Sequence, residues 1–206
     1  MSDTHQNLDI LAREISQCRV CDEQRLTVEH CPPMQRGVGS DLVVIGIQPG
    51  STEQTTGEAF SGPAGINLIK WLQAAELGST REDILKRVHL TSLCKCRVVR
   101  QSHFSRAWRN CAHFLTAQLR LLQPRLCATV GLPPLQYLFN YSGSLEDIVG
   151  DAYPEHELNP SLFPMLPNGC SIVPLPHPSP VSRWLNSEAH CQLLDQALVT
   201  IKEKLR

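Results

Sequence analysis

Four short apolar runs alternate along the chain with segments whose apolar side chains recur at helical spacing. The runs are rich in Val, Ile and Leu and too short to be core helices, which is typical of strands buried on both faces of a parallel sheet. They lie at 41–50 (DLVVIGIQPG), 87–93 (RVHLTSL), 125–131 (RLCATVG) and 170–176 (CSIVPLP). Strands that alternate with helices predict an α/β fold, with three α/β/α layers around a mainly parallel four-stranded sheet.

Helical periodicity accounts for most of the remaining chain. Pro124 is expected to end one helix, and Ser79 or Thr80 to cap the start of another. The expected helices cover 7–17, 65–77, 105–123, 132–140 and 187–205. The polar stretch after the first strand is expected to be a long loop. With 206 residues, no repeat and no long linker, the whole chain 1–206 is expected to form a single domain.

The charges of the chain nearly cancel, with 19 Lys and Arg against 20 Asp and Glu and a formal net charge of −1. No global basic field therefore points to a polyanionic partner, and any nucleic-acid binding must be local. The first residues lack the segments of a signal peptide, and no stretch reaches the roughly 20 apolar residues that span a bilayer. We expect a cytoplasmic protein that has no membrane partner and acts as a monomer.

The predicted topology indicates where a ligand would bind. In open parallel sheets, ligands lie beyond the carboxyl ends of the strands. Four segments are expected to meet there: residues 46–51, residues 92–97, Gly131 and residues 177–183.

Nine cysteines are many for a cytoplasmic chain, and an odd number argues against a simple disulfide framework. Cys18 and Cys21 have the CxxC spacing that lets two thiolates reach one metal centre. Cys96 follows a predicted strand end, and Cys111 lies in the next predicted helix. Four thiolates from three elements are therefore candidates to surround one cluster.

Spacing alone leaves two alternatives open at this centre. Cys94 is two residues from Cys96 and would lie on the same strand face, so that either could be the third ligand. Zinc competes with iron and sulfide as the bound metal. Cys127, Cys170 and Cys191 lie in predicted strands or helices and are expected to be core residues, whereas Cys31 has no assigned role.

Several ordered motifs resemble the uracil-DNA glycosylase superfamily, in particular its iron–sulfur branch, family 4. These motifs are CRVC at 18–21, GIQPGSTEQTTGEAFSGPAG at 46–65, LTSLCKCR at 90–97, RNCAHFLTAQLRLLQPRLCATVG at 109–131 and PLPHPSP at 174–180. The resemblance covers almost the whole chain.

The resemblance implies a monofunctional DNA base-excision repair enzyme that hydrolyses the N-glycosidic bond of uracil, or of another deaminated base, in DNA. Such a protein would be nucleoid-associated in a prokaryote. It also implies a structural [4Fe-4S] cluster ligated by Cys18, Cys21, Cys96 and Cys111, and so favours Cys96 over Cys94.

A glycosylase must flip the nucleotide out of the stack, hold the base, stabilise negative charge on the leaving base and admit water to the sugar. A preorganised donor meets the third need, and His177, where a strand meets a Pro-locked loop, is suited to that role. The resemblance assigns His177 to base and transition-state contact. It also places Gln48 near the attacking water.

The GIQPG turn departs from the family 4 pattern GEAPG, because Ile47 stands where an acidic residue is typical. Ile47 and Gln48 remain candidates for base contact. An amide can orient a water molecule but cannot act as its base. We therefore expect slow chemistry driven mainly by leaving-group stabilisation. Glu53 is a reserve carboxylate, or else a solvated loop charge.

Two further residues are candidates to hold the base. Phe60 lies in a polar loop, where its ring either anchors the loop or stacks on a flipped pyrimidine, and the resemblance favours stacking. Ser92 stands where family 4 usually has an Asn that binds the uracil edge. A hydroxyl offers fewer donors and acceptors than an amide, so specificity could widen toward hypoxanthine or xanthine.

The loop that follows His177 is expected to bind DNA. The resemblance gives Val181 the position of the wedge that enters the base stack, with Arg183 as a phosphate or strand contact. The expected contacts in this loop are Ser179, Pro180, Val181, Ser182 and Arg183. Local phosphate contacts are also expected from Lys95, Arg97, Arg100 and Arg106.

Two other functions remain open from the sequence. Ile47 and Ser92 depart from the family pattern, as they would in a non-catalytic homologue that binds damaged DNA without releasing a base. Alternatively, the cluster itself could be the function, in an iron–sulfur redox sensor.

Overall fold

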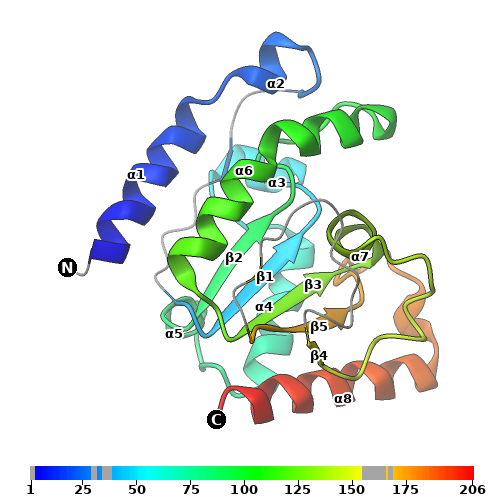
Figure 1. Ribbon diagram of the computed structural model, residues 1–206. Coiled ribbons are helices and arrows are strands. Elements are labelled where there is room, and N and C mark those ends of the chain that lie inside the picture. Colours follow the sequence, from blue (N-terminus) through cyan, green and yellow to red (C-terminus); the bar gives the residue numbers. More distant parts are fainter. Residues whose placement is uncertain (1–2, 29–31, 34–38, 155–165, 167–168) are drawn as a thin grey trace.

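A central five-stranded sheet organises the protein, and Figure 1 shows it from the β2 edge to the β4 edge. The computed structural model describes residues 3–28, 32–33, 39–154, 166 and 169–206. The strand order is β2-β1-β3-β5-β4. The strands are β1 (Leu42–Gly46), β2 (Val88–Ser92), β3 (Leu126–Val130), β4 (Tyr153–Pro154) and β5 (Ser171–Leu175). Four of them run parallel, as predicted.

The fifth strand was not predicted. β4 has two residues and pairs antiparallel with β5 at the edge of the sheet, Tyr153 opposite Ile172. A strand this short carries no alternation that a sequence pattern could reveal.

Helices cover both faces of the sheet. The long helices are α1 (Asp3–Gln17), α4 (Pro63–Ala74), α6 (Phe104–Leu122) and α8 (Glu188–Lys204). The shorter ones are α2 (Val20–Glu23), α3 (Ser51–Thr56), α5 (Arg81–Leu85) and α7 (Leu132–Phe139). In Figure 1, α6 crosses one face, α4 and α8 lie on the other, and α1 lies outside α6. The predicted α/β/α fold is confirmed.

β1 shows why the sheet is buried on both faces. Val43 and Ile45 pack in the core beneath α6, while Leu42 and Val44 pack in the core beneath α4 and α8. Each of the four is at most 1% exposed. Alternate side chains of a strand point to opposite faces, so a continuous apolar run is what two covered faces require.

Local signals set most helix boundaries. The Thr80 side chain accepts a hydrogen bond from the Asp83 backbone N–H at 3.1 Å and caps α5, which settles the choice between Ser79 and Thr80. α6 ends at Leu122, and Gln123 takes a left-handed φ of 46° just before Pro124. The six-residue α3 was missed, because it lies in the polar stretch expected to be a loop.

Among the described residues, none of the helices combines the length and the apolar character needed to cross a bilayer.

Candidate functional site

A cavity of about 770 Å³ opens at the carboxyl ends of the strands, where the topology predicts a ligand site. The register brings these ends together, since Gly46 of β1 pairs with Ser92 of β2. The turn 46–50, Phe60, Ser92 and His177 all line the cavity, and we call them the base end. The base-contact residues expected from the sequence are thus gathered at one place.

The GIQPG turn continues the pairing of β1 with the chain that follows β2. The Gly46 carbonyl accepts from Leu93 N–H at 2.9 Å, and the Ile47 carbonyl accepts from Cys94 N–H at 3.0 Å. The Ile47 side chain packs partly against the core beneath α6. Its apolar side chain supplies no proton acceptor to the cavity.

The amide of Gln48 is oriented by the main chain. Its Oε1 accepts a hydrogen bond from Val98 N–H at 3.0 Å. Because a backbone N–H can only donate, the side-chain oxygen is the atom on that side, and Nε2 is left as a donor. In this arrangement Gln48 can donate a hydrogen bond into the cavity, but its amide cannot act as a general base.

Glu53 is a buried carboxylate that holds the loop after β1. Its Oε2 accepts from Gly50 N–H at 2.9 Å and its Oε1 from Gly62 N–H at 2.8 Å. The side chain is 9% exposed, so it is not the solvated loop charge considered from the sequence. Both oxygens are engaged by backbone donors, and the carboxylate ties the two ends of the segment that carries Phe60.

Phe60 is held in a strained backbone conformation. Its φ is 52°, in the left-handed region that bulky residues seldom occupy. The Arg81 guanidinium donates to the carbonyls of Ala59 and Phe60 at 2.5 and 3.0 Å. A Cβ on Gly46 would lie 2.9 Å from the Phe60 ring, which shows how closely the ring approaches the strand end. Strain of this kind concentrates at ligand sites.

Ser92 is the last residue of β2. Its Oγ donates to the Cys94 carbonyl at 2.8 Å, which uses the only proton of the hydroxyl. Toward the cavity, Ser92 can therefore offer acceptor lone pairs but no donor.

His177 offers the cavity a hydrogen-bond donor, whereas Ser92 offers only acceptors. Its Nδ1 accepts from Ser179 N–H at 3.2 Å, so the neutral ring carries its proton on Nε2. His177 lines the cavity, and partial burial of the ring lowers its pKa below 6.5. Near neutral pH, His177 is a neutral imidazole with one free N–H donor.

The segment 177–183 forms a tight surface loop. Ser179 closes it: its carbonyl accepts from Ser182 N–H at 2.9 Å, and its Oγ accepts from Val181 N–H at 3.4 Å. Val181 is 86% exposed at the tip, and Pro180 and Arg183 are exposed as well. An apolar side chain thus projects from a short rigid loop beside the cavity, as a wedge would require.

An anchor that the sequence did not reveal follows this loop. Trp184 begins the short helix η2 (Trp184–Asn186), and its Nε1 donates to Glu146 Oε1 at 2.9 Å. The His190 ring stacks on the indole, with centroids 4.3 Å apart, and its Nδ1 lies 2.8 Å from the Trp184 carbonyl. No motif links Glu146 to residues 38 and 44 positions further along, so pattern analysis had no signal for it.

Three segments meet at the other candidate centre, and the first of them is distant in sequence from the other two. They are 18–28, 94–99 and 104–111, and we call them the thiol end. Thr27 and Val98 form an isolated antiparallel bridge, and Val28 N–H donates to the Arg97 carbonyl at 3.1 Å. Asn110 donates from Nδ2 to Gln24 Oε1 at 3.1 Å and to Cys21 Sγ at 3.5 Å.

Buried thiols contact one another at the thiol end. A hydrogen bond with Cys111, together with burial, raises the pKa of Cys21. At Cys111 the contact with Cys21 lowers the pKa, but a hydrogen bond with Cys94 and burial raise it more, to about 11. These thiols are therefore protonated in the absence of a cation. Cys18 and Cys96 are half-buried in the same segments.

The candidate donors are cysteine thiols, the ligand type of both iron–sulfur clusters and structural zinc. Within the residues that the structure covers, no group of three or more His, Cys, Asp or Glu side chains is gathered closely enough to hold one metal ion. Cys94 is 1% exposed and contacts Cys111, so the structure leaves it beside the expected ligand Cys96.

The remaining cysteines divide between core and surface. Cys127 and Cys170 are core residues, as predicted, each 1% exposed and with their sulfurs 3.6 Å apart. The expectation for Cys191 was wrong, because it lies exposed on the outer side of α8. Cys31 lies outside the described residues.

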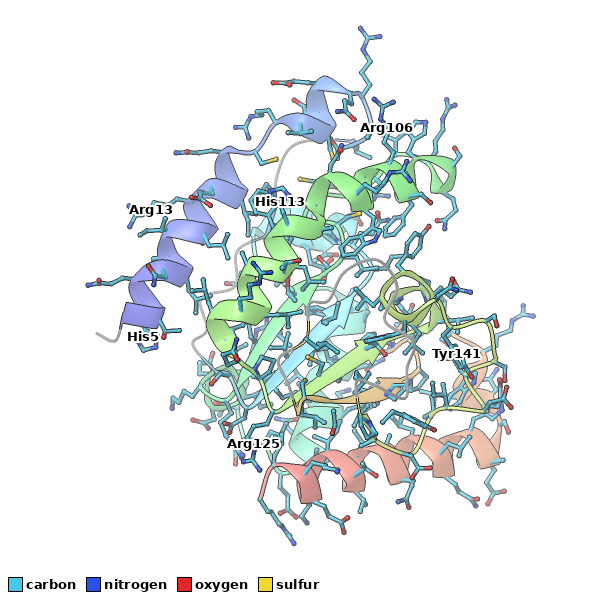
Figure 2. All side chains as sticks on the ribbon, viewed as in Figure 1. His5, Arg13, Arg106, His113, Arg125 and Tyr141 are labelled. Carbon is cyan, nitrogen blue, oxygen red and sulfur yellow. The ribbon has the colours of Figure 1, made fainter. Side chains whose placement is uncertain are left out.

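The prediction that Lys95 contacts a phosphate is also wrong. Lys95 is 7% exposed and its amine donates inward, so it cannot reach a phosphate. Burial lowers the pKa of Lys95 to about 8. Arg100 and Arg106 are exposed and Arg97 is half-buried. Figure 2 shows Arg106 at the end of the molecule where α2 meets α6.

Comparison with known proteins gives a consistent result. The model of the uracil DNA glycosylase superfamily matches residues 34–201. A type-4 uracil-DNA glycosylase of Archaeoglobus fulgidus is 32% identical over 139 residues, which are 66% of this chain and 65% of the relative. A type-4 uracil-DNA glycosylase of Saccharolobus solfataricus is 28% identical over 145 residues, 70% of this chain and 64% of the relative.

A third relative has the same name. It is a type-4 uracil-DNA glycosylase of Thermotoga maritima, 27% identical over 131 residues, 63% of this chain and 65% of the relative. The chain thus spans slightly less than two thirds of the length of these relatives. With the family match covering most of the chain and the expected residues meeting at the strand ends, the protein belongs to the uracil-DNA glycosylase superfamily.

Proposed function

We propose that this protein is a monofunctional DNA glycosylase that hydrolyses the N-glycosidic bond of uracil, or of another deaminated base, in DNA. The observation that carries the proposal is the convergence of the GIQPG turn, Phe60, Ser92 and His177 on one cavity at the strand ends. The names of the relatives support the same activity.

The polarities of the side chains suit a flipped deaminated base. Ser92 offers an acceptor, which fits the ring N–H that uracil, hypoxanthine and xanthine all carry. His177 offers an N–H donor, which fits the carbonyl oxygen on which negative charge develops as the bond breaks. Phe60 offers an aromatic face for stacking, worth about 1–3 kcal/mol per base.

Water activation is the weak part of this site. The turn provides Gln48 Nε2 as a donor and Ile47 as an apolar neighbour, with no carboxylate at either position. The reaction therefore rests on stabilising the leaving base, with water attacking after most of the bond has broken. Gln48 positions that water without taking its proton.

The loop 177–183 completes the proposal for DNA. Val181 enters the base stack as the nucleotide leaves it, and Arg183 contacts the backbone nearby. The rigid turn at Ser179 and the Trp184 anchor hold the loop in place before DNA arrives, which reduces the ordering needed on binding.

We also propose that Cys18, Cys21, Cys96 and Cys111 hold a [4Fe-4S] cluster. When bound, the cluster supplies cross-links among the three segments of the thiol end. The segments already pair through Thr27 and Val98, and Asn110 donates to a thiol, so the chain positions the ligands before the cluster binds. Cys94 is the alternative third ligand.

The test is base release from oligonucleotides that contain uracil, hypoxanthine or xanthine, single- and double-stranded, followed by alkaline strand cleavage. The proposal expects release from at least one of them by the anaerobically purified protein, and loss of release in His177→Ala. Iron and sulfide analysis of the same preparation tests the cluster. Stoichiometric zinc without sulfide would show that the four thiolates hold a zinc ion and not an iron–sulfur cluster.

A second candidate function is favoured by the engagement of Gln48 Oε1. With that oxygen on Val98 N–H and with Ile47 beside it, nothing in the turn accepts a proton, as expected of a protein that binds damaged DNA without cleaving it. Binding to these oligonucleotides without release, even with protein in large excess, would establish this second function and exclude the first.

A further inference from the structure

Lys95 is a buried cation whose hydrogen-bond partners are all neutral. Its Nζ donates to Thr91 Oγ1 at 2.8 Å, to the Ser92 carbonyl at 2.7 Å and to Gln118 Oε1 at 2.8 Å. These three bonds use every N–H of the ammonium group. Among the described residues, no carboxylate lies within ion-pairing distance of this amine.

Such an arrangement leaves the charge unbalanced. Neutral oxygens satisfy the donors, but a buried charge without an opposite charge is strongly destabilising. Lys95 lies between Cys94 and Cys96 in the sequence, and a negative charge on Cys111 or Cys94 would favour the charged form of its amine. The Lys95 backbone N–H also hydrogen-bonds to the Cys111 sulfur. Lys95 lines the cavity with its side chain and contacts the thiol end through its main chain, so an anionic centre at the thiol end would lie beside this residue.

We infer that Lys95 is the internal counter-charge of the four-thiolate centre and ties that centre to the end of β2 that holds the base. This inference rests on the proposed cluster. A cluster with four thiolate ligands is anionic, and its reduction potential depends on nearby charge. The same amine holds the Ser92 carbonyl and Thr91 Oγ1, so one buried cation serves both the thiol end and the base end.

Gln118 fixes the position of the amine and provides a second way to test it. Its Oε1 accepts from Thr91 Oγ1 at 2.9 Å as well as from Lys95, so its Nε2 faces His89 Nε2 at 3.3 Å as a donor. Gln118 is 8% exposed on α6. A carboxylate of the same shape at this position would pair with Lys95 and cancel its charge toward the cluster.

The experiment compares the midpoint potential of the cluster in five proteins, by redox titration of the purified holoprotein. Lys95→Gln and Gln118→Glu are both expected to shift the potential to more negative values, because each removes net positive charge beside an anionic centre. Lys95→Arg keeps the charge and is expected to restore most of the wild-type potential. Lys70→Gln, which removes an exposed cation on α4, is expected to leave the potential unchanged.

The outcomes separate this inference from the proposal on which it rests. Wild-type protein without iron and sulfide overturns both. Wild-type protein with a cluster whose potential does not move in Lys95→Gln or Gln118→Glu overturns the counter-charge alone. If Lys95→Gln does not fold, Gln118→Glu decides, since its volume matches the wild type and its charge has the opposite effect to that of Lys95.

Discussion

The base end and the thiol end are stabilised in different ways. At the base end, main-chain groups nearby in sequence fix the side chains: Ser179 N–H orients His177, and Gly50 and Gly62 N–H hold Glu53. At the thiol end, Cys21 and Cys111 contact each other across 90 positions, through side chains alone. The base end is therefore held by contacts with main-chain groups close in sequence, whereas the two thiols meet only through a long-range side-chain contact, which we expect a bound group to reinforce.

The largest expected effect breaks the base end. His177→Ala removes the donor that we propose for the charge on the leaving base, and loss of such a donor lowers the rate constant by about 10²–10³. Single-turnover base release measures it, and the unfolding temperature is expected to stay close to wild type. His113→Ala, an exposed histidine on α6 marked in Figure 2, is the control. An equal loss in both variants would contradict the role of His177.

Glu53→Gln weakens the base end through its scaffold. The amide retains one acceptor, so one of the two backbone N–H groups is left facing another donor. The free energy of unfolding is expected to fall by about 1.5–3 kcal/mol, the range for a hydrogen bond to a charged group. Urea denaturation measures it, with Glu58→Gln, an exposed carboxylate in the same segment, as the matched control. Equal stability of the two variants would show that Glu53 does not hold the loop.

Cys111→Ser tests the dependence of the thiol end on a bound group. Replacing a buried thiol by a hydroxyl is expected to destabilise the metal-free protein by only about 1–3 kcal/mol. In the holoprotein, iron content and unfolding temperature are expected to fall together. Cys191→Ser, at an exposed position, keeps both. If the Cys111→Ser variant lacks iron but unfolds at the wild-type temperature, the thiol end does not depend on a bound group for its stability.

Trp184→Phe sharpens the comparison at the loop 177–183, which we propose binds DNA. The phenyl ring still stacks on His190, but the hydrogen bond to Glu146 is lost, which is worth about 0.5–1.5 kcal/mol. Affinity for double-stranded DNA is expected to weaken several-fold, with little change in the single-turnover rate at saturation. Fluorescence anisotropy measures the affinity. A rate that falls while the affinity stays constant would place the effect in the cavity instead.

The smallest expected effect is the pH dependence of base release. The pKa of His177 is lowered below 6.5 by burial, so the ring stays neutral as the pH falls through that value. The rate is expected to remain level from pH 8 to about 6.5 and to decline only below the lowered pKa. For stability, the unfolded chain takes up this proton first, so the contribution is present above pH 6.5 and is lost below it. A rate that halves at pH 6.5 would contradict the neutral ring.

The sequence was sufficient for the elements with strong local signals. The continuous apolar run of β1 predicted a strand covered on both faces, and Pro124 predicted the end of α6. β4 and α3 were beyond such analysis, since two residues cannot alternate and a six-residue polar helix has no apolar stripe. What decides these elements is contact with the rest of the fold.

At the candidate site, the sequence predicted which residues gather but not how their side chains are oriented. The motifs predicted Gln48, Phe60, Ser92 and His177 as site residues, and all four line one cavity. They did not show that Gln48 Oε1 is already bonded to Val98, or that Lys95 points inward to Gln118 instead of toward DNA. These orientations depend on partners 50 and 23 residues away in the sequence.

The strained backbone of Phe60 has a consequence for engineering. A search for thermostable variants would favour glycine at this left-handed position, because glycine adopts a φ near 52° without the penalty that a bulky residue incurs. The more thermostable variant would lack the Phe60 ring that lines the cavity. Selection for heat resistance and selection for base release are thus expected to favour different residues at position 60.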